Sequence, residues 1–298
     1  LSLTVAYESK VNYGDIFSQV RVWDTLIANH LMKKNICVPP REDHIKETKY
    51  EGAYVKEPKV GQHKWVVSFD INSLYPHIII QYNISPEKIL GVKSSGVSVN
   101  KMLTQSTPLS HLKTEGACLT PNGAMFKNDG QGFLPEMMET MYNERVIYKK
   151  RMLKAKKEYE KTKDPKLVRE ISRCHNIQWA RKIALNSAYG AVGNQYFRYY
   201  DVRQASAITT AGQFIIRFIE EKVNTYLNEI LKTHDKLDYI VASDTDSIYV
   251  TLDKLVQKTC EGKNNEQICN FLDRVVDSRL EPFIEKCFNE LADYTNAF

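Results

Sequence analysis

Two carboxylates lie at the centre of a segment that is otherwise built like a pair of strands. Between Tyr239 and Val250, β-branched and apolar residues flank a short polar tip that carries Asp244 and Asp246. This pattern predicts a β-hairpin with acids at its turn. Repulsion and desolvation oppose two like charges beside a buried strand unless a cation lies between them, and Mg²⁺ takes such carboxylates together with substrate phosphates. An acidic turn without a metal is the commoner arrangement, so the pair alone leaves both interpretations open.

Length and composition are typical of a globular protein. Of the 298 residues, 43% are hydrophobic and 26% are charged. No apolar run approaches the ~20 residues that span a bilayer, so no membrane partner is expected. The six cysteines are scattered without a CxxC pair, which predicts reduced thiols in an intracellular protein and no zinc site. The chain starts with Leu1 instead of Met, so we expect it to be a piece of a longer protein.

Positive charge is concentrated in one stretch of the chain. The net charge is only +5, yet between Arg145 and Lys182 fourteen Lys and Arg residues face four Asp and Glu residues. A basic segment of this kind favours a phosphate-bearing partner.

Much of the N-terminal half carries no evident chemistry. Residues 1 to about 45 are predicted to be helical and to end at Pro39-Pro40, and residues 46–62 form a connector. Residues 83–133 are rich in loops, and the turn pairs Asn122-Gly123 and Asp129-Gly130 predict a hairpin around Ala124-Met125-Phe126.

One strand in this half ends in an acid. The run from Trp65 to Asp70 predicts a strand, and an apolar helix follows over residues 74–82, with Ser73 placed to cap it. An acid at a strand end that faces a helix start can serve a metal and a phosphate together. It can equally do no more than assist the cap, and the sequence pattern favours neither reading.

Two long helices are predicted in the basic stretch, one over residues 134–163 and one over residues 166–191. Asp164-Pro165 breaks the pattern between them, so the pair forms a helical hairpin. One stripe on the second helix is either a solvated face or a binding surface, and it consists of Gln178, Lys182, Asn186 and Tyr189. Gly190, next to the stripe, allows close approach of another backbone or of a base pair.

The C-terminal part is predicted to be mainly helical around the acidic hairpin. A long amphipathic helix covers residues 204–231, and most of the last forty residues are helical. The apolar face of the long helix is predicted to lie in the core through Ile208, Phe214, Ile215, Phe218, Val223 and Leu227.

Three motifs, in one order, resemble the signatures of family B DNA polymerases. Residues 70–76 resemble D-x-x-S-L-Y-P, residues 182–190 match K-x-x-x-N-S-x-Y-G, and residues 244–247 match D-T-D-S. The likeness is greatest to the replicative enzymes of T-even-like bacteriophages and covers nearly the whole chain from about residue 13. One departure is that Ala242-Ser243 stand where the family often has Tyr-Gly, which puts contacts to the primer end in doubt.

The resemblance implies a two-metal mechanism. Asp70 and Asp246, with Asp244 contributing and the backbone carbonyl of Ile71 as a further ligand, would hold two Mg²⁺ ions, for which Mn²⁺ can substitute. The substrates would be a primer-template DNA and deoxynucleoside triphosphates, and Lys182 would also act in catalysis.

The same resemblance assigns a nucleotide site. Backbone N–H groups of Ser73 and Leu74 would hold the outer phosphates, and Tyr75 would stack under the sugar and exclude a 2′-hydroxyl. The residues that would grip the triphosphate are Arg145, Lys149, Lys182 and Asn186. Tyr189 and Gly190 would check the shape of the new base pair.

The expected fold is α+β. An antiparallel palm sheet of the ferredoxin-like or RRM-like kind would carry the acids, backed by helices, with the helical hairpin inserted as fingers. We expect residues 1–62 to be the tail of a preceding exonuclease or N-terminal region with a connector, and residues 63–133 the first part of the palm. Residues 134–192 would be the fingers and residues 193–298 the second part of the palm.

The resemblance also implies parts that this chain lacks. The proofreading acids would precede residue 1, and the thumb and any surface for a sliding clamp would follow residue 298. An intracellular location is expected, in the host cytoplasm if the source is viral. The alternative is a catalytically idle fragment that binds nucleotide or DNA. A kinase or nucleotide hydrolase is disfavoured because no G-x-x-x-x-G-K-[ST] loop occurs.

Overall fold

A computed structural model describes residues 1–298 except 46–48, 94–95 and 234–235. Three residues of the predicted connector, 46–48, therefore lie outside the described residues. The chain forms two compact units. The first comprises Leu1–Tyr50, Tyr75–Leu90 and Phe126–Ile208, and the second comprises Glu51–Leu74, Gly91–Met125 and Thr209–Phe298. Within the described part of the chain, no helix has the length and apolar character needed to cross a membrane.

The first unit begins with α1 (Ser2–Ser9), a 3₁₀ helix η1 (Tyr13–Phe17) and α2 (Gln19–Lys33). Trp23 of α2 is buried, and its indole N–H donates to the carbonyl of Ala184 at 3.2 Å. The prediction of helix as far as Pro39 was wrong, because α2 ends at Lys33. Asn35 takes a left-handed backbone with φ 57°, which terminates the helix before the prolines are reached.

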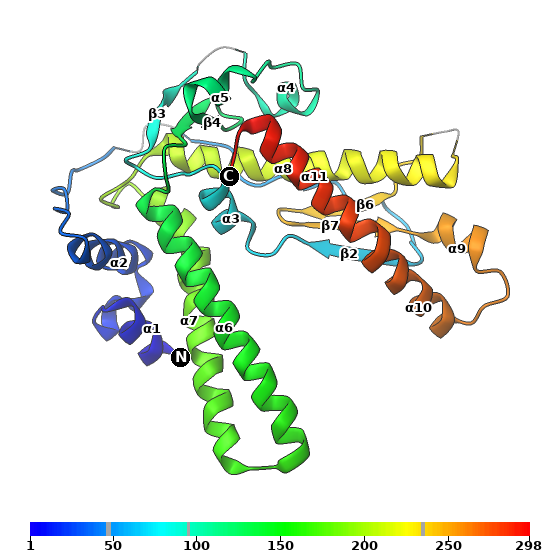
Figure 1. The fold of residues 1–298 in the computed structure, drawn as a ribbon, viewed down its shortest axis with the longest axis horizontal. Helices are drawn as coiled ribbons and strands as arrows, with labels where there is room; N and C mark the ends of the chain where they lie inside the picture. Colours follow the sequence, from blue (N-terminus) through cyan, green and yellow to red (C-terminus); the bar gives the residue numbers. More distant parts are fainter. Residues whose placement is uncertain (46–48, 94–95, 234–235) are drawn as a thin grey trace. The chain divides into compact units, whose positions relative to one another are not determined.

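The helical hairpin of the first unit is confirmed. It consists of α6 (Phe133–Thr162) and α7 (Pro165–Val192), which run side by side in Figure 1. Lys163 has φ 53° and ends α6, and the Asp164 carboxylate accepts a hydrogen bond from the Lys166 N–H at 2.9 Å. The break therefore lies at the Asp-Pro pair, as predicted.

The start of α6 is capped by residues that are distant in sequence. They follow α3 (Leu74–Gln81), whose predicted bounds are confirmed within one residue. The Phe133 N–H donates to Glu87 Oε1 at 2.7 Å, and the Leu134 N–H donates to Ser85 Oγ at 3.3 Å. Asn83 is fully buried and bonds three further backbone groups, the carbonyls of residues 127 and 130 and the N–H of residue 132.

The second unit is built on a four-stranded antiparallel sheet with the order β1-β6-β7-β2. Its strands are β1 (Val55–Lys56), β2 (Val66–Asp70), β6 (Ile240–Asp244) and β7 (Ser247–Thr251). The predicted strand and the predicted acidic hairpin are confirmed. The two-residue strand β1 was not predicted; it lies in the stretch expected to be a connector.

Helices cover one face of this sheet. They are α8 (Val202–Leu231), α10 (Asn265–Val275) and α11 (Glu281–Thr295), with a single π-helical turn, η2 (Val276–Leu280), joining the last two into one rod, whereas α9 (Asp253–Thr259) lies beyond the end of β7 (Figure 1). Ile248 and Val250 of β7 pack into the same core as Phe214 and Phe218 of α8. Of the predicted core residues of α8, only Ile215 is half-buried instead of buried.

A smaller three-stranded sheet has the order β3-β5-β4. It consists of β3 (Ile89–Val92), β5 (Ala124–Lys127) and β4 (Ala117–Leu119), and two short helices accompany it, α4 (Val99–Leu103) and α5 (His111–Glu115). The predicted turn at Asn122-Gly123 joins β4 to β5. Gly123 has φ +85°, and a Cβ there would lie 2.5 Å from the Lys93 carbonyl oxygen, so glycine is required. Helices and antiparallel strands together confirm the α+β class.

Candidate active site

The acidic turn is a tight structure held from both sides. The Asp246 N–H donates to the Asp244 carbonyl at 2.6 Å, and Thr245 has a left-handed φ of 55°. The Thr245 N–H donates to the Tyr54 carbonyl at 3.0 Å, and the Thr245 hydroxyl donates to Asp244 Oδ1 at 2.9 Å. The turn is therefore fixed to the segment that carries β1.

The sheet brings Asp70 to the same end as the acidic turn. Asp70 and Asp244 are both paired with Ser247, one from each neighbouring strand. Directly opposed residues share a face of a sheet, so both aspartates project from the face opposite to the core side chain Ile248. The Ile71 N–H donates to the Asp246 carbonyl at 2.7 Å, which ties the residue after Asp70 to the turn.

Electrostatics within this cluster favour a bound cation. Burial raises the pKa of Asp246, and the negative charges of Asp70 and Asp244 raise that pKa further. Asp70 and Asp244 are exposed, so their oxygens are open to solvent. Clustered carboxylate oxygens that are open to solvent suit a hard divalent cation. Among the described residues, no group of three or more His, Cys, Asp or Glu side chains is arranged to hold a metal, so a cation here would also need backbone, water or phosphate ligands.

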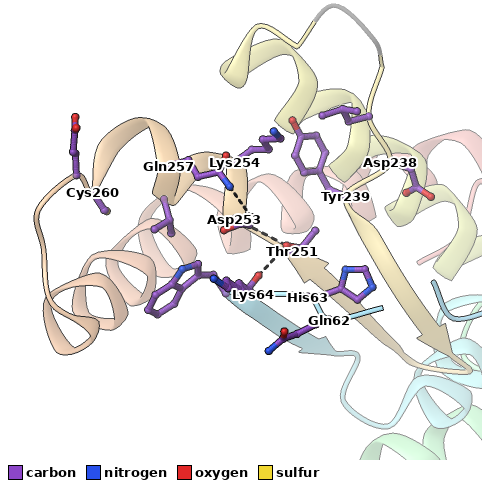
Figure 2. Close-up of a pocket in the computed structure, with 14 residues that line it drawn as sticks. Gln62, His63, Lys64, Asp238, Tyr239, Thr251, Asp253, Lys254, Gln257 and Cys260 are labelled. Carbon is purple, nitrogen blue, oxygen red and sulfur yellow. Dashed lines mark hydrogen bonds between the residues drawn. The ribbon is translucent and has the colours of Figure 1, made fainter. Parts of the chain in front are cut away.

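The second unit has one cavity beside the acidic cluster and another at a distance from it. A cavity of about 420 Å³ adjoins Asp70, Ile71 and Asn72 and is lined on its other side by α8 and α11. A larger one, of about 760 Å³, lies at the opposite end of the β6–β7 hairpin, beside Tyr239 and Thr251 (Figure 2). The residues that line the larger cavity include none of the predicted site residues. Size alone therefore does not locate the chemistry.

Three tyrosines gather in the first unit. The rings of Tyr75 and Tyr189 lie 5.0 Å apart between centroids, and Tyr50 meets Tyr189 edge-on at 6.5 Å. Burial raises the pKa of Tyr189 well above its usual range, and its hydrogen bond with Tyr50 adds to the rise. A Cβ on Gly190 would lie 2.3 Å from Gln19 Oε1, so this position is closely approached. Tyr50 was not among the predicted site residues, because it lies in an irregular segment.

The basic residues predicted to bind phosphate all lie on the helical hairpin. On α6, Arg145 is partly buried and Lys149 is exposed; on α7, Asn186 is exposed. Lys182 Nζ lies 5.0 Å from the centroid of the Trp179 ring. The neighbouring Arg181 forms two ion pairs of 2.7 Å, with Glu8 and Glu144, and is thereby a structural residue. Gln178, predicted to share the polar stripe, is instead 7% exposed and buried.

The predicted residues thus fall into two groups. Those of the second unit are Asp70, Ile71, Ser73, Leu74, Asp244 and Asp246, and those of the first unit are Tyr75, Arg145, Lys149, Lys182, Asn186, Tyr189 and Gly190. The structure brings the three acids together within one unit and Tyr75 and Tyr189 together within the other. Ser73 precedes α3 with a left-handed φ of 53°.

The chain thus combines an acidic hairpin, an aspartate at the end of the neighbouring strand and a long basic helical hairpin. Residues 13–291 match the family model described as DNA polymerase family B. The chain belongs to this family.

The relatives include phage enzymes. The chain is 34% identical to the DNA-directed DNA polymerase of Escherichia phage RB69 and 32% identical to that of Enterobacteria phage T4. Both alignments cover 99% of this chain and 37% of the relative, so the chain spans little more than a third of their length. A DNA polymerase of Orf virus is 30% identical over 67% of this chain.

Proposed function

We propose that this chain forms the polymerase active site of a template-directed DNA polymerase, which adds deoxynucleotides to the 3′-hydroxyl of a primer during replication. The observation that carries the proposal is the strand register that sets Asp70 and Asp244 on either side of Ser247, with Asp246 in the turn between β6 and β7. Family membership supports the same reading.

Three carboxylates would hold the metals, those of Asp70, Asp246 and Asp244, together with the Ile71 carbonyl. Two Mg²⁺ ions, or Mn²⁺ in their place, would lower the pKa of the primer hydroxyl and neutralise the departing pyrophosphate. The pKa of Asp246, raised by burial and by its acidic neighbours, supports this fit because a cation would relieve the repulsion.

Other residues would bind the nucleotide. The N–H groups of Ser73 and Leu74 would hold the outer phosphates, and four polar side chains would grip the triphosphate: Arg145, Lys149, Lys182 and Asn186. Such charge-assisted contacts also stabilise the charge that develops during transfer.

Aromatic contacts would set the choice of substrate. Tyr75 would exclude a 2′-hydroxyl, and Tyr189 with Gly190 would test the shape of the base pair. The packing of Tyr75 against Tyr189 supports this assignment, because a ring held by a neighbour is a rigid steric barrier.

Family membership supports a proposal for the domain roles. Residues 63–133 and 193–298 would be the two parts of a ferredoxin-like palm, residues 134–192 the fingers, and residues 1–62 the end of a preceding region. The partners would be primer-template DNA, deoxynucleoside triphosphates and, through other regions, a sliding clamp. The protein would act inside the cell, in the host cytoplasm if it is viral.

A second candidate is a fragment that binds nucleotide or DNA without catalysis. The basic α6–α7 hairpin favours it, because its positive charge supports phosphate contacts whether or not the acids are catalytic.

Single-nucleotide primer extension with Mg²⁺ separates the two. We expect extension by the wild-type chain and only background with Asp246→Asn, whereas Asp273→Asn, at an exposed acid of α10, should match the wild type. Binding of a deoxynucleotide without any extension would favour the idle fragment.

Sugar selection has its own test. Tyr75→Ala should raise incorporation of ribonucleotides relative to deoxynucleotides, because the steric barrier is removed. Tyr196→Ala, at a tyrosine that is 62% exposed, is the control. An unchanged ratio for Tyr75→Ala would remove the role assigned to this ring.

A further inference from the structure

The two-residue strand β1 pairs with the end of β6 that leads into the acidic turn. Val55 is paired with Asp244, and Lys56 is paired with Ser243. Residues just before and just after β1 form further hydrogen bonds to the same hairpin. The Thr245 N–H donates to the Tyr54 carbonyl at 3.0 Å, and the Lys59 N–H donates to the Val241 carbonyl at 2.8 Å. The backbone that carries Asp244 is thus attached to residues 54–59 as well as to β7.

The Lys56 side chain lies between two carboxylates of other elements. Its Nζ is 2.9 Å from Asp238 Oδ2, just before β6, and 4.0 Å from Glu220 Oε2 on α8. The Lys56 and Glu220 side chains are 19% and 9% exposed, so this contact is shielded from water. Figure 2 labels Asp238 where β6 begins.

Glu220 is the member of this group that most needs a cation. Burial raises its pKa, and the Ser243 hydroxyl and the Lys56 ammonium act against that rise, with Arg217 contributing less. Removing one partner of a buried ion pair leaves an uncompensated charge, which is strongly destabilising. Lys56 is itself paired with Ser243, the residue before Asp244, so the ion pair with Glu220 is anchored beside the acidic turn.

We propose that Lys56 is a positioning residue for the acidic turn: by pairing with Glu220 and Asp238 it holds β1 against β6 and so fixes the backbone of Asp244 and Asp246. The consequence is that cation binding by the acids depends on Lys56, and this consequence rests on the proposed function. Outer-shell residues that orient metal ligands have effects of this kind.

The test uses the 298-residue chain and Mn²⁺ as the probe. Mn²⁺ binding is measured by electron paramagnetic resonance, and protection of the Thr245 and Asp246 amides by hydrogen exchange. We expect Lys56→Met to weaken Mn²⁺ binding about tenfold and to lower the protection of both amides. Lys59→Met is the matched control, since Lys59 Nζ also lies 3.0 Å from Asp238 Oδ2 but has no ion pair with Glu220, and it should stay within about twofold of wild type.

Two further variants separate positioning from general stability. Combining Lys56→Met with Glu220→Gln removes the uncompensated charge and should restore most of the Mn²⁺ affinity and amide protection. Lys56→Arg keeps the charge and should retain wild-type affinity, and it carries the test if Lys56→Met does not fold. A tenfold loss in Lys56→Arg at unchanged Tm would overturn the proposal.

Failure of this inference is distinct from failure of the proposed function. If the wild-type chain does not bind Mn²⁺, the proposed metal site fails, and amide protection alone decides the role of Lys56. If the wild type binds Mn²⁺ and Lys56→Met binds it equally with the amides still protected, the inference is wrong and the metal site stands.

Discussion

At the scale of single residues, the Asp238 carboxylate beside the hairpin accepts hydrogen bonds from several elements. Burial works against its ionisation, but hydrogen bonds from Lys56, Asn224 and Lys59 outweigh burial and hold its pKa at about 2. Asn224 completes the arrangement by accepting a hydrogen bond from the Tyr239 N–H at 2.7 Å. The end of α8, the start of β6 and the segment after β1 are thereby joined through one acid.

This carboxylate should make stability depend on acid pH. Its folded pKa of about 2 is below the ordinary value of 3.8, so its contribution is complete above about pH 4 and is lost as the pH falls towards 2. We expect wild type to exceed Asp238→Asn in Tm at pH 6, and the gap to close as the pH falls from 4 to 2. A gap that is constant over this range would show that ionisation of Asp238 does not contribute. The effect should be modest, because the side chain is 41% exposed.

At the scale of elements, the helical hairpin depends on a cap supplied from outside it. The N-cap residue of α6 is Gly132, whose missing side chain cannot accept a hydrogen bond, so Ser85 and Glu87 take that role. A Cβ on Gly132 would lie 2.6 Å from the Ser85 Cβ, which explains the glycine. The segment after α3 therefore fixes where α6 begins.

Asn83 should be the residue of this segment that is most sensitive to substitution. Asn83→Ala removes two part-buried hydrogen bonds that its amide donates to carbonyls and one buried hydrogen bond that it accepts from the Gly132 N–H, and a buried group left unpaired costs about 1–3 kcal/mol. We expect a loss of about 3 kcal/mol or more in unfolding free energy by urea titration. Asn100→Ala, at an exposed asparagine, should change little. Asn83→Gly tolerates the native φ of 52°, so its difference from alanine isolates backbone strain.

Long periodic elements were predictable from sequence, and short ones were not. The helical hairpin, the helix α8 and the acidic hairpin each extend over enough residues for apolar periodicity and turn residues to agree. β1 has only two residues and precedes Glu57-Pro58, so no alternation can develop, and its pairing with β6 is a tertiary effect. The early end of α2 depends on the backbone of Asn35, which sequence periodicity does not report.

In the candidate site, too, some residues could be predicted from sequence and others could not. The three acids could be proposed because they lie in recognisable motifs, and strand pairing then places them at one end of a sheet. Tyr50, Lys56 and Glu220 belong to no motif, and only tertiary contacts connect them with Tyr189 or Ser243.

At the scale of the whole molecule, charge is divided unevenly. The stretch from Arg145 to Lys182, with fourteen basic and four acidic residues, lies entirely within the α6–α7 hairpin. The rest of the chain is net acidic, since the total is only +5. A polyanion such as DNA would therefore be attracted to the hairpin.

Salt dependence tests this attraction. We expect log K for a primer-template to fall linearly with log salt concentration, with a slope of about −0.9 for each phosphate neutralised. Replacing three exposed lysines of α6 by Gln (Lys154, Lys157 and Lys161) should make that slope shallower. The control removes equal charge elsewhere, at the exposed Lys101, Lys113 and Lys286. Equal slopes for both triple variants would contradict phosphate contacts by these three lysines of α6.

The π-helical turn at 276–280 has a consequence for chain length. Such a turn holds one residue more than an α-helical turn, so both halves of the rod from Asn265 to Thr295 direct apolar side chains to one core, with Leu272 before the turn and Leu291 after it. Deleting the exposed Ser278 would convert the rod to an uninterrupted α-helix and would leave both halves facing the core. Deleting the exposed Asn270 would instead rotate the part of the rod after it by about 100° about the helix axis. Calorimetry should therefore find a Tm close to that of the wild type for the deletion of Ser278 and a much lower Tm for the deletion of Asn270. The rod thus contains one residue more than an uninterrupted α-helix needs, and a deletion within the π-helical turn should leave both halves facing the same core.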